Sequence, residues 1–173
     1  MERGWQFDSA SDHKMRNKNF FKHDTAIVSD DSKIGENTKI WHFSHIREKS
    51  TIGKNVTIGQ NVYVDEGVII GDNCKIQNNV SIYKGVVIGD NVFVGPSVVF
   101  TNDLYPRVDG WNEQRLVKTL VEDSVSIGAN STIICGIKIM KNSLIGAGSV
   151  VTKDVPENML AYGNPAKVVR GIK

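Results

Sequence analysis

The stretch from Ile52 to Lys75 reads IGKNVT-IGQNVY-VDEGVI-IGDNCK, four hexapeptides that each begin with a large aliphatic residue. The same six-residue spacing extends back to Val28 and forward to Phe100, with an apolar residue at every first position. Asn, Asp or Gly often follows three places later, and these residue types tolerate the positive φ angles of sharp corners. A period of six excludes an amphipathic α-helix, whose apolar positions recur every three or four residues. The sequence therefore predicts an all-β solenoid of short strands joined by corners.

Three six-residue sides would complete a triangular coil, and successive coils would stack about 4.8 Å apart like strands of a parallel sheet. The rhythm fails after Phe100 and resumes at Val121, which predicts one ejected loop within residues 104–120. A rigid scaffold often carries its function on such a loop. We expect an N-terminal extension over residues 1–23, the repeat over 24–155 and a short C-terminal closing segment over 156–173.

Composition limits the class of protein. The 173 residues are 40% hydrophobic and 23% charged, which suffices for one domain with a buried core. A net charge of +2 argues against nucleic-acid binding, which needs a clustered basic face. The sequence has two cysteines without a CxxC pair, no long apolar run and no apolar signal core near its N-terminus. We therefore expect a cytoplasmic protein that binds neither nucleic acid nor a membrane.

One side of the predicted coils carries no charge. Assigning hexapeptides in turn to three sides places six segments on it, none of which contains Asp, Glu, Lys or Arg. The segments are residues 40–45, 58–63, 76–81, 94–99, 127–132 and 145–150. Depletion of charge together with aromatic side chains is typical of the core of a subunit interface. The alternative is that hexapeptide sides are simply rich in Asn.

The hexapeptide motif points to a family. The pattern of Ile or Val, Gly, any residue, Asn, then Val or Ser, as in Ile52-Gly53-Lys54-Asn55-Val56, resembles the hexapeptide-repeat acyltransferases. The resemblance covers about residues 24–173, and Gly163-Asn164-Pro165-Ala166-Lys167 is similar to the family's closing segment. It implies a left-handed parallel β-helix, a homotrimer with active sites between subunits, and acetyl-CoA as cosubstrate without a metal.

The histidines bear on the acceptor of the acyl group. A hydroxyl acceptor normally needs a histidine base, but His13, His23, His42 and His45 all precede the loop. His42 stands more than three coils before the loop, about 16 Å at strand spacing. A sugar amine needs less help, because neighbouring hydroxyls lower its pKa below the value of about 10.4 for lysine. The sequence therefore favours an amine acceptor.

A closer resemblance suggests which amine. Stretches such as Ile40-Trp41-His42 and Phe100-Thr101-Asn102 are similar to the N-acetyltransferases of UDP- or dTDP-linked 3-amino sugars, which feed bacterial surface-polysaccharide biosynthesis. The resemblance implies that Asn102 orients the reacting groups, with Asp103 a weaker candidate for holding the amine. Candidate substrate-binding residues are His42, His45, Gln60, Tyr63, Gln77, Asn78 and Arg107. Candidate coenzyme-binding residues are the small Ala129, Ala147 and Gly148, which would let the pantetheine arm approach the backbone, and the cations Lys153, Lys167 and Arg170, which would meet the phosphates.

Two other interpretations stay open. One is an O-acetyltransferase acting on a sugar or another small hydroxyl acceptor. The other is a metal-binding or non-catalytic β-helix protein of the carbonic-anhydrase-like class. One coil after His42 and His45 stand Gln60 and Tyr63, so the ligand set for a catalytic zinc is incomplete. Binding of acetyl-CoA would distinguish a transferase from this second class.

Overall fold

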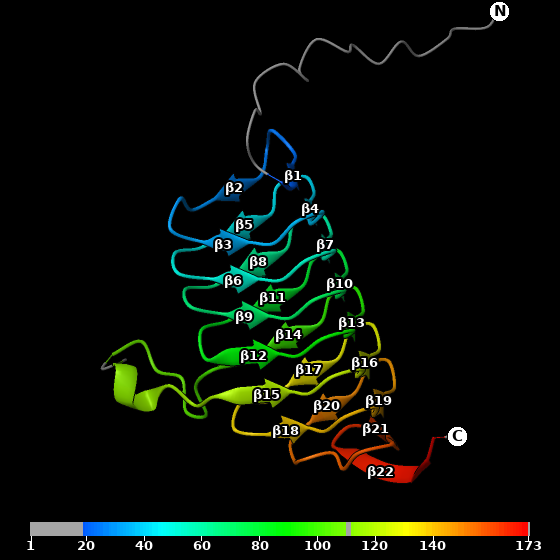
Figure 1. Ribbon diagram of the computed structural model, residues 1–173. Helices are drawn as coiled ribbons and strands as arrows, with labels where there is room; N and C mark the ends of the chain where they lie inside the picture. The colour runs from blue at the N-terminus through cyan, green and yellow to red at the C-terminus, as the bar shows by residue number, and fades with distance from the viewer. Residues whose placement is uncertain (1–18, 110–111, 173) are drawn as a thin grey trace, which may run out of the picture.

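The computed structural model describes residues 19–109 and 112–172. Most of the predicted N-terminal extension and, within the loop, Gly110 and Trp111 lie outside these residues. The chain forms a left-handed parallel β-helix that projects one loop and closes with a hairpin (Figure 1). The fold class predicted from the six-residue period is confirmed. Across 19–109 and 112–172, no helix is long and apolar enough to cross a membrane.

Three parallel sheets, here named A, B and C, form the three sides, and the chain visits them in turn (Figure 1). Sheet A contains β1 (Phe21–Lys22), β4 (Lys39–Ile40), β7 (Thr57–Ile58), β10 (Lys75–Ile76), β13 (Phe93–Val94), β16 (Ser126–Ile127), β19 (Leu144–Ile145), β21 (Met159–Gly163) and, antiparallel to β21, β22 (Ala166–Gly171). Sheet B contains β2 (Ile27–Val28), β5 (His45–Ile46), β8 (Tyr63–Val64), β11 (Ser81–Ile82), β14 (Val99–Phe100), β17 (Thr132–Ile133) and β20 (Val150–Val151). Sheet C contains β3 (Lys33–Ile34), β6 (Thr51–Ile52), β9 (Ile69–Ile70), β12 (Val86–Ile88), β15 (Thr119–Val121) and β18 (Lys138–Ile139).

The core is the column of side chains at the first hexapeptide position. In most two-residue strands the first residue faces outward and the second is buried, as Ile40, Ile58 and Ile76 show with 0% exposure. Phe100 stands in the same column and is also fully buried. The six-residue period places one such side chain on each side of every coil, so these side chains form continuous apolar columns. Between the columns the corners bury small residues, valines such as Val56 and serines such as Ser44.

Stacking of the coils explains the glycine that follows the aliphatic residue. A Cβ added to Gly71 would lie 2.6 Å from the backbone carbonyl of Gly89 in the next coil. The corner asparagines have a different role, because Asn55 and Asn73 have φ angles of 56° and 58°. Their side chains also form a ladder, in which Asn55 Nδ2 donates to Asn73 Oδ1 at 3.1 Å. The hexapeptide motif is therefore a steric and conformational requirement of the coil.

We expect Gly71→Ala to destabilise the fold by about 1–3 kcal/mol, because the added methyl group overlaps backbone that cannot move without disturbing the ladder. Gly67→Asn is the control, since Gly67 has a φ of 69° and nothing within 4 Å of its Cβ position. Asn tolerates this φ better than other side chains do. Urea unfolding compares the two variants, and equal midpoints would contradict the steric explanation.

The strand pairing shows how many residues the ejected loop inserts into one coil. Val86 pairs with Thr119, 33 residues along the chain, whereas Val87 and its partner Ile69 in the preceding coil are 18 apart. The loop runs from 101 to 118, so it starts and ends slightly earlier than the predicted 104–120. It contains the 3-10 helix η2 (Glu113–Arg115), which begins after the capping side chain of Asn112.

Both ends of the repeat also differ in detail from the expected boundaries. The first strand β1 lies inside the predicted extension and pairs with β4, although Lys22 stands opposite the buried Ile40. An apolar residue is missing from this end position, so the six-residue pattern does not reveal the strand. At the other end, residues 156–173 contain the hairpin of β21 and β22, whose first strand continues sheet A.

Candidate functional site

The uncharged segments form a corner of the prism and the sheet beside it. Each runs from the end of a sheet A strand around a turn to the first residue of a sheet B strand, as residues 58–63 do. We call the turns between these sheets the A–B corner, and those between sheets B and C the B–C corner. Strands of sheet B carry no Asp, Glu, Lys or Arg, whereas Lys39 faces outward on sheet A and Lys33 on sheet C. The charge-free surface therefore comprises sheet B and the A–B corner from residue 40 onward, because the first turn of that corner carries the exposed Asp24.

The structure distributes the predicted site residues over four places. The A–B corner holds His42, Gln60, Gln77, Asn78, Ala129, Ala147 and Gly148. Sheet B holds His45 and Tyr63, the B–C corner and its loop hold Asn102, Asp103, Arg107 and Lys153, and the C-terminal hairpin holds Lys167 and Arg170. Because sheet B separates the two corners, Asn102 is not brought to the A–B corner of its own chain.

A shallow pocket of about 320 Å³ opens on the A–B corner, lined by Trp41, His42, Gln60 and Asn78. Three of these residues were predicted to bind substrate. The sequence analysis did not select Trp41. The sequence does contain a signal for it, because Trp41 occupies the second hexapeptide position, which is Gly in most of the uncharged segments. Its side chain is 38% exposed, and its ring lies parallel to that of His42, with 9° between the planes.

A second pocket, of about 270 Å³, lies between the last coil and the hairpin. Lys153 and Lys167 both line it, together with apolar residues that include Val151 and Val168. These two predicted coenzyme-binding lysines are thus brought to one cavity, while Arg170 is not among its lining residues. The lining also includes Asp154, whose Oδ1 accepts from the Lys138 amide at 2.8 Å. The two lysines outnumber this carboxylate, and beside the apolar wall they could hold phosphates next to a less polar part of a ligand.

The base of the loop is fixed while the Asn102 side chain stays free. The Asn102 carbonyl oxygen accepts from the Val117 amide at 3.0 Å, and Thr101 Oγ1 accepts from the Cys135 amide at 2.9 Å. The half-buried side-chain amide of Asn102 makes no hydrogen bond within the part of the chain that the structure describes. It is therefore available to a ligand.

The carboxylate of Asp103, in contrast, is engaged inside the loop. Its Oδ1 accepts from the Tyr105 amide at 2.8 Å, and its Oδ2 lies 3.0 Å from Nη2 of Arg115. The geometry at Oδ2 is that of an ion pair without a well-aligned hydrogen bond. Asp103 would have to release Arg115 before it could hold an amine, so its structural role is the more direct one.

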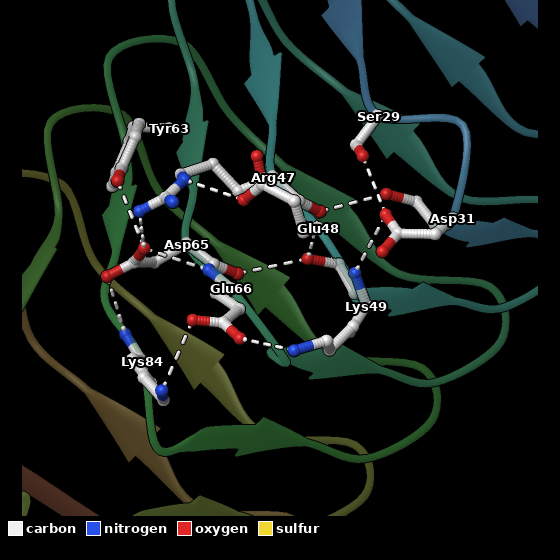
Figure 2. A network of polar contacts seen from close by, with 11 residues as sticks. Ser29, Asp31, Arg47, Glu48, Lys49, Tyr63, Asp65, Glu66 and Lys84 are labelled. Carbon is white, nitrogen blue, oxygen red and sulfur yellow. Dashed lines mark hydrogen bonds and ion pairs between the residues drawn. The ribbon is translucent and has the colours of Figure 1, made fainter. Parts of the chain in front are cut away.

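An ion-pair network ties the loop to the coils above it. Figure 2 shows the part of this network within the coils, where Lys49 and Lys84 both contact Glu66. Lys84 Nζ lies 3.2 Å from Glu66 Oε2 and 2.8 Å from Glu113 Oε1 in helix η2. Glu113 and Glu66 raise the pKa of Lys84, and Lys49 and Lys84 lower the pKa of Glu66. Tyr63 also belongs to the network, because its hydroxyl donates to Asp65 Oδ1 at 3.1 Å. Burial raises the pKa of this hydroxyl, so it stays protonated and keeps the donor. The hydroxyl predicted to meet substrate thus has an internal partner.

We expect Lys84→Met to loosen the loop without unfolding the coils, because it removes the cation that joins Glu66 to Glu113. Exposed ion pairs contribute little to global stability, so the melting temperature should change little. Hydrogen exchange of residues 101–118 should accelerate, whereas Lys75→Met, on the outer face of sheet A, should leave it unchanged. Unchanged exchange in Lys84→Met would show that the network does not restrain the loop.

Within the described ranges, no group of three or more His, Cys, Asp or Glu side chains is arranged to hold a metal ion. The two cysteines, Cys74 and Cys135, are buried and unpaired. Burial raises the pKa of the Cys74 thiol to about 11, which leaves it protonated at neutral pH. The Cys74 thiol therefore packs in the core and is not a nucleophile.

Comparison with known proteins identifies the family. The bacterial transferase hexapeptide model matches residues 31–66 and 118–153, and the hexapeptide repeat of succinyl-transferase matches 50–84. A hexapeptide-repeat acetyltransferase of Vibrio cholerae, solved with acetyl coenzyme A, is 32% identical, with a TM-score of 0.54. The match covers 67% of this chain and 70% of that chain. This chain belongs to the hexapeptide-repeat acyltransferase family. The predicted family resemblance is confirmed.

Two curated relatives show the chemistry found in this family. Galactoside O-acetyltransferase of Lactococcus lactis is 40% identical over 84 residues, 47% of this chain and 41% of its own. The dTDP-3-amino-3,6-dideoxy-α-D-galactopyranose 3-N-acetyltransferase of Aneurinibacillus thermoaerophilus is 53% identical over 51 residues, 30% of this chain and 27% of its own. The matches thus span less than half the length of these relatives.

Proposed function

We propose that this acyltransferase moves acetyl from acetyl-CoA to the 3-amino group of a UDP- or dTDP-linked sugar, for surface-polysaccharide biosynthesis. The observation that carries the proposal is the free amide of Asn102 at the base of the loop, at a level of the helix where the described chain has no histidine. Two relatives support it, since one was solved with acetyl coenzyme A and another is named for N-acetylation of a dTDP-linked amino sugar.

A homotrimer would complete the site. Asn102 and the A–B corner of its own chain lie on opposite sides of sheet B, so the loop must meet that corner on a neighbouring copy. Closed cyclic symmetry about an axis parallel to the β-helix keeps each residue at its own height. Asn102 would then lie below the pocket at Trp41 and above the coils of Ala129 and Ala147, between a sugar-nucleotide end and a coenzyme end.

The chemistry needs few protein groups. The lone pair of the neutral amine attacks the thioester carbonyl, the C–S bond breaks, and the amine proton leaves with the thiolate or to water. The Asn102 amide can donate to the carbonyl oxygen as negative charge develops, or accept from the amine and orient its lone pair. Lys153 and Lys167 would hold the coenzyme phosphates in the cavity beside the hairpin.

O-acetylation is the second candidate, favoured by the 40% identity to a galactoside O-acetyltransferase. It would need a base near the reacting hydroxyl. His42 lies three coils above the turn at Pro96, about 14 Å at strand spacing, and the proposed symmetry does not change that height. The described histidines therefore lie beyond direct proton transfer at the level of Asn102, which favours the amine.

The deciding experiment supplies acetyl-CoA with matched pairs of nucleotide sugars that differ only in an amine or a hydroxyl at C3. Release of free thiol measures turnover. We expect turnover of the 3-amino member of a UDP or dTDP pair and none of its 3-hydroxy counterpart. Turnover of hydroxyl acceptors without amines would overturn the proposal in favour of O-acetylation.

A further inference from the structure

The pocket at the A–B corner has a composition that suits a flat, uncharged ring. Its lining residues, Trp41, His42, Gln60 and Asn78, provide two aromatic rings and two amides without a charged group. A volume of about 320 Å³ lies at the small end of the range for ligand sites. Phosphate and carboxylate groups are disfavoured there, because nothing in the lining balances their charge.

The rings form a preorganised stack. Phe21 packs against Trp41 with 5.3 Å between ring centroids, and His23 stacks on His42 at 3.6 Å. Trp41 and His42 are nearly parallel and 6.1 Å apart. Neighbouring rings thus hold both pocket rings in place, while the Trp41 side chain remains 38% exposed. An exposed indole fixed in this way provides a stacking surface that loses little freedom when a ligand binds.

The amides add polar specificity. Asn78 Oδ1 accepts from the Gln60 backbone amide at 3.0 Å. Its Nδ2 makes no hydrogen bond among the residues that the structure describes and can donate to a ligand. At the corresponding position of another corner, Asp72 Oδ1 accepts the same bond from the Lys54 amide at 2.7 Å. Coil stacking is therefore satisfied by Asp as well as by Asn. At the pocket this position is occupied by Asn78, which is neutral and carries N–H donors, and not by Asp.

We infer that this pocket binds the uracil or thymine base of the nucleotide sugar, stacked on Trp41 and hydrogen-bonded by Asn78 and Gln60. Both bases present two carbonyl acceptors around one N–H donor, which two side-chain amides can match. The inference rests on the proposed function for the rest of the ligand. His42 and the level of Asn102 are about 16 Å apart along the β-helix, a separation that ribose and diphosphate can span.

Binding of free nucleotides tests the pocket without any turnover. Calorimetry should show that UDP and dTDP bind more tightly than CDP and GDP. Trp41→Ala should weaken UDP binding about 10- to 100-fold, the usual effect of losing one base-stacking ring, and Trp41→Phe should restore most of it. Phe93→Ala is the control, because Phe93 is 39% exposed on sheet A, outside the pocket.

Asn78→Asp tests the base edge. Asp72 shows that a carboxylate can accept the backbone bond at this position, so the coil should remain folded. The substitution removes the donor to a uracil carbonyl and supplies an acceptor for the amino group of cytosine. Repulsion of the diphosphate acts on both nucleotides alike, so the ratio of UDP to CDP affinity is the readout. We expect that ratio to fall at least tenfold.

Three results would overturn the inference: a constant UDP to CDP ratio in Asn78→Asp, tighter binding of GDP than of UDP, or UDP affinity unchanged in Trp41→Ala. The third result could come with loss of the oligomer, and that combination would identify the rings as a subunit contact. If UDP binding depends on Trp41 but no amino sugar is acetylated, the pocket stands and the proposed acceptor is wrong. If amino sugars are acetylated with unchanged KM in Trp41→Ala, the pocket alone is wrong.

Discussion

Asn102→Ala should lower kcat about 10²- to 10³-fold, the usual loss when an amide that stabilises developing charge is removed. Acetyl-CoA affinity and thermal stability should stay close to wild type. The side-chain amide makes no hydrogen bond within the described residues, and the loop base is held instead through the Asn102 carbonyl and the Thr101 hydroxyl. Steady-state kinetics with a 3-amino nucleotide sugar and calorimetry with acetyl-CoA separate the two effects.

Asn112→Ala is the matched control, an asparagine in the same loop whose side chain caps η2 by accepting from the Gln114 amide at 3.0 Å. It should change kcat little. Asn102→Asp refines the assignment, because the carboxylate keeps an acceptor for the amine but has no donor for the thioester oxygen. Full activity of Asn102→Ala together with loss of kcat in His42→Ala would instead indicate a hydroxyl acceptor.

The sequence revealed the fold because each hexapeptide position has its own steric cause. Ile70 fills the interior, Gly71 clears the next coil and Asn73 takes a positive φ, so the pattern repeats wherever a coil repeats. The hexapeptide pattern fails at the two ends of the β-helix, where a coil is incomplete. Lys22 replaces the aliphatic residue in β1, and the hairpin strand β22 pairs antiparallel, outside the six-residue rule.

The candidate site was harder to predict than the fold. The sequence was sufficient to select the residue types of the site. It did not show that each strand starts one residue before the buried aliphatic residue. Because of this shift, each predicted uncharged segment covers a corner and the first residue of a sheet B strand. Internal partners were also invisible, such as Asp65 for the Tyr63 hydroxyl and Arg115 for Asp103. The first contact joins residues two apart in one coil and the second joins residues 12 apart in the loop, and the six-residue spacing encodes neither.

Thr132→Glu should dissociate the proposed trimer. Thr132 faces outward in β17, on the charge-free sheet B, and is half-buried in the single chain. If sheet B is covered by a neighbouring copy, the substitution buries three unpaired carboxylates per trimer, each costing on the order of several kcal/mol. Thr132 serves this test better than Tyr63, whose hydroxyl bonds Asp65 within its own chain, so that its replacement would perturb the coil as well.

Thr51→Glu supplies the comparison that assigns the effect to a surface. Thr51 has the same position and the same half-buried environment in β6, but on sheet C. Both variants lose the same β-branched residue, so the intrinsic stability of the single chain should fall by similar amounts. Any additional fall in the unfolding midpoint of Thr132→Glu should reflect the lost assembly. Sedimentation velocity should then show monomers for Thr132→Glu and trimers for Thr51→Glu. Dissociation by Thr51→Glu alone would move the interface to sheet C. Such an interface would bury the outward-facing Lys33 and Lys138, two unpaired cations that sheet B avoids.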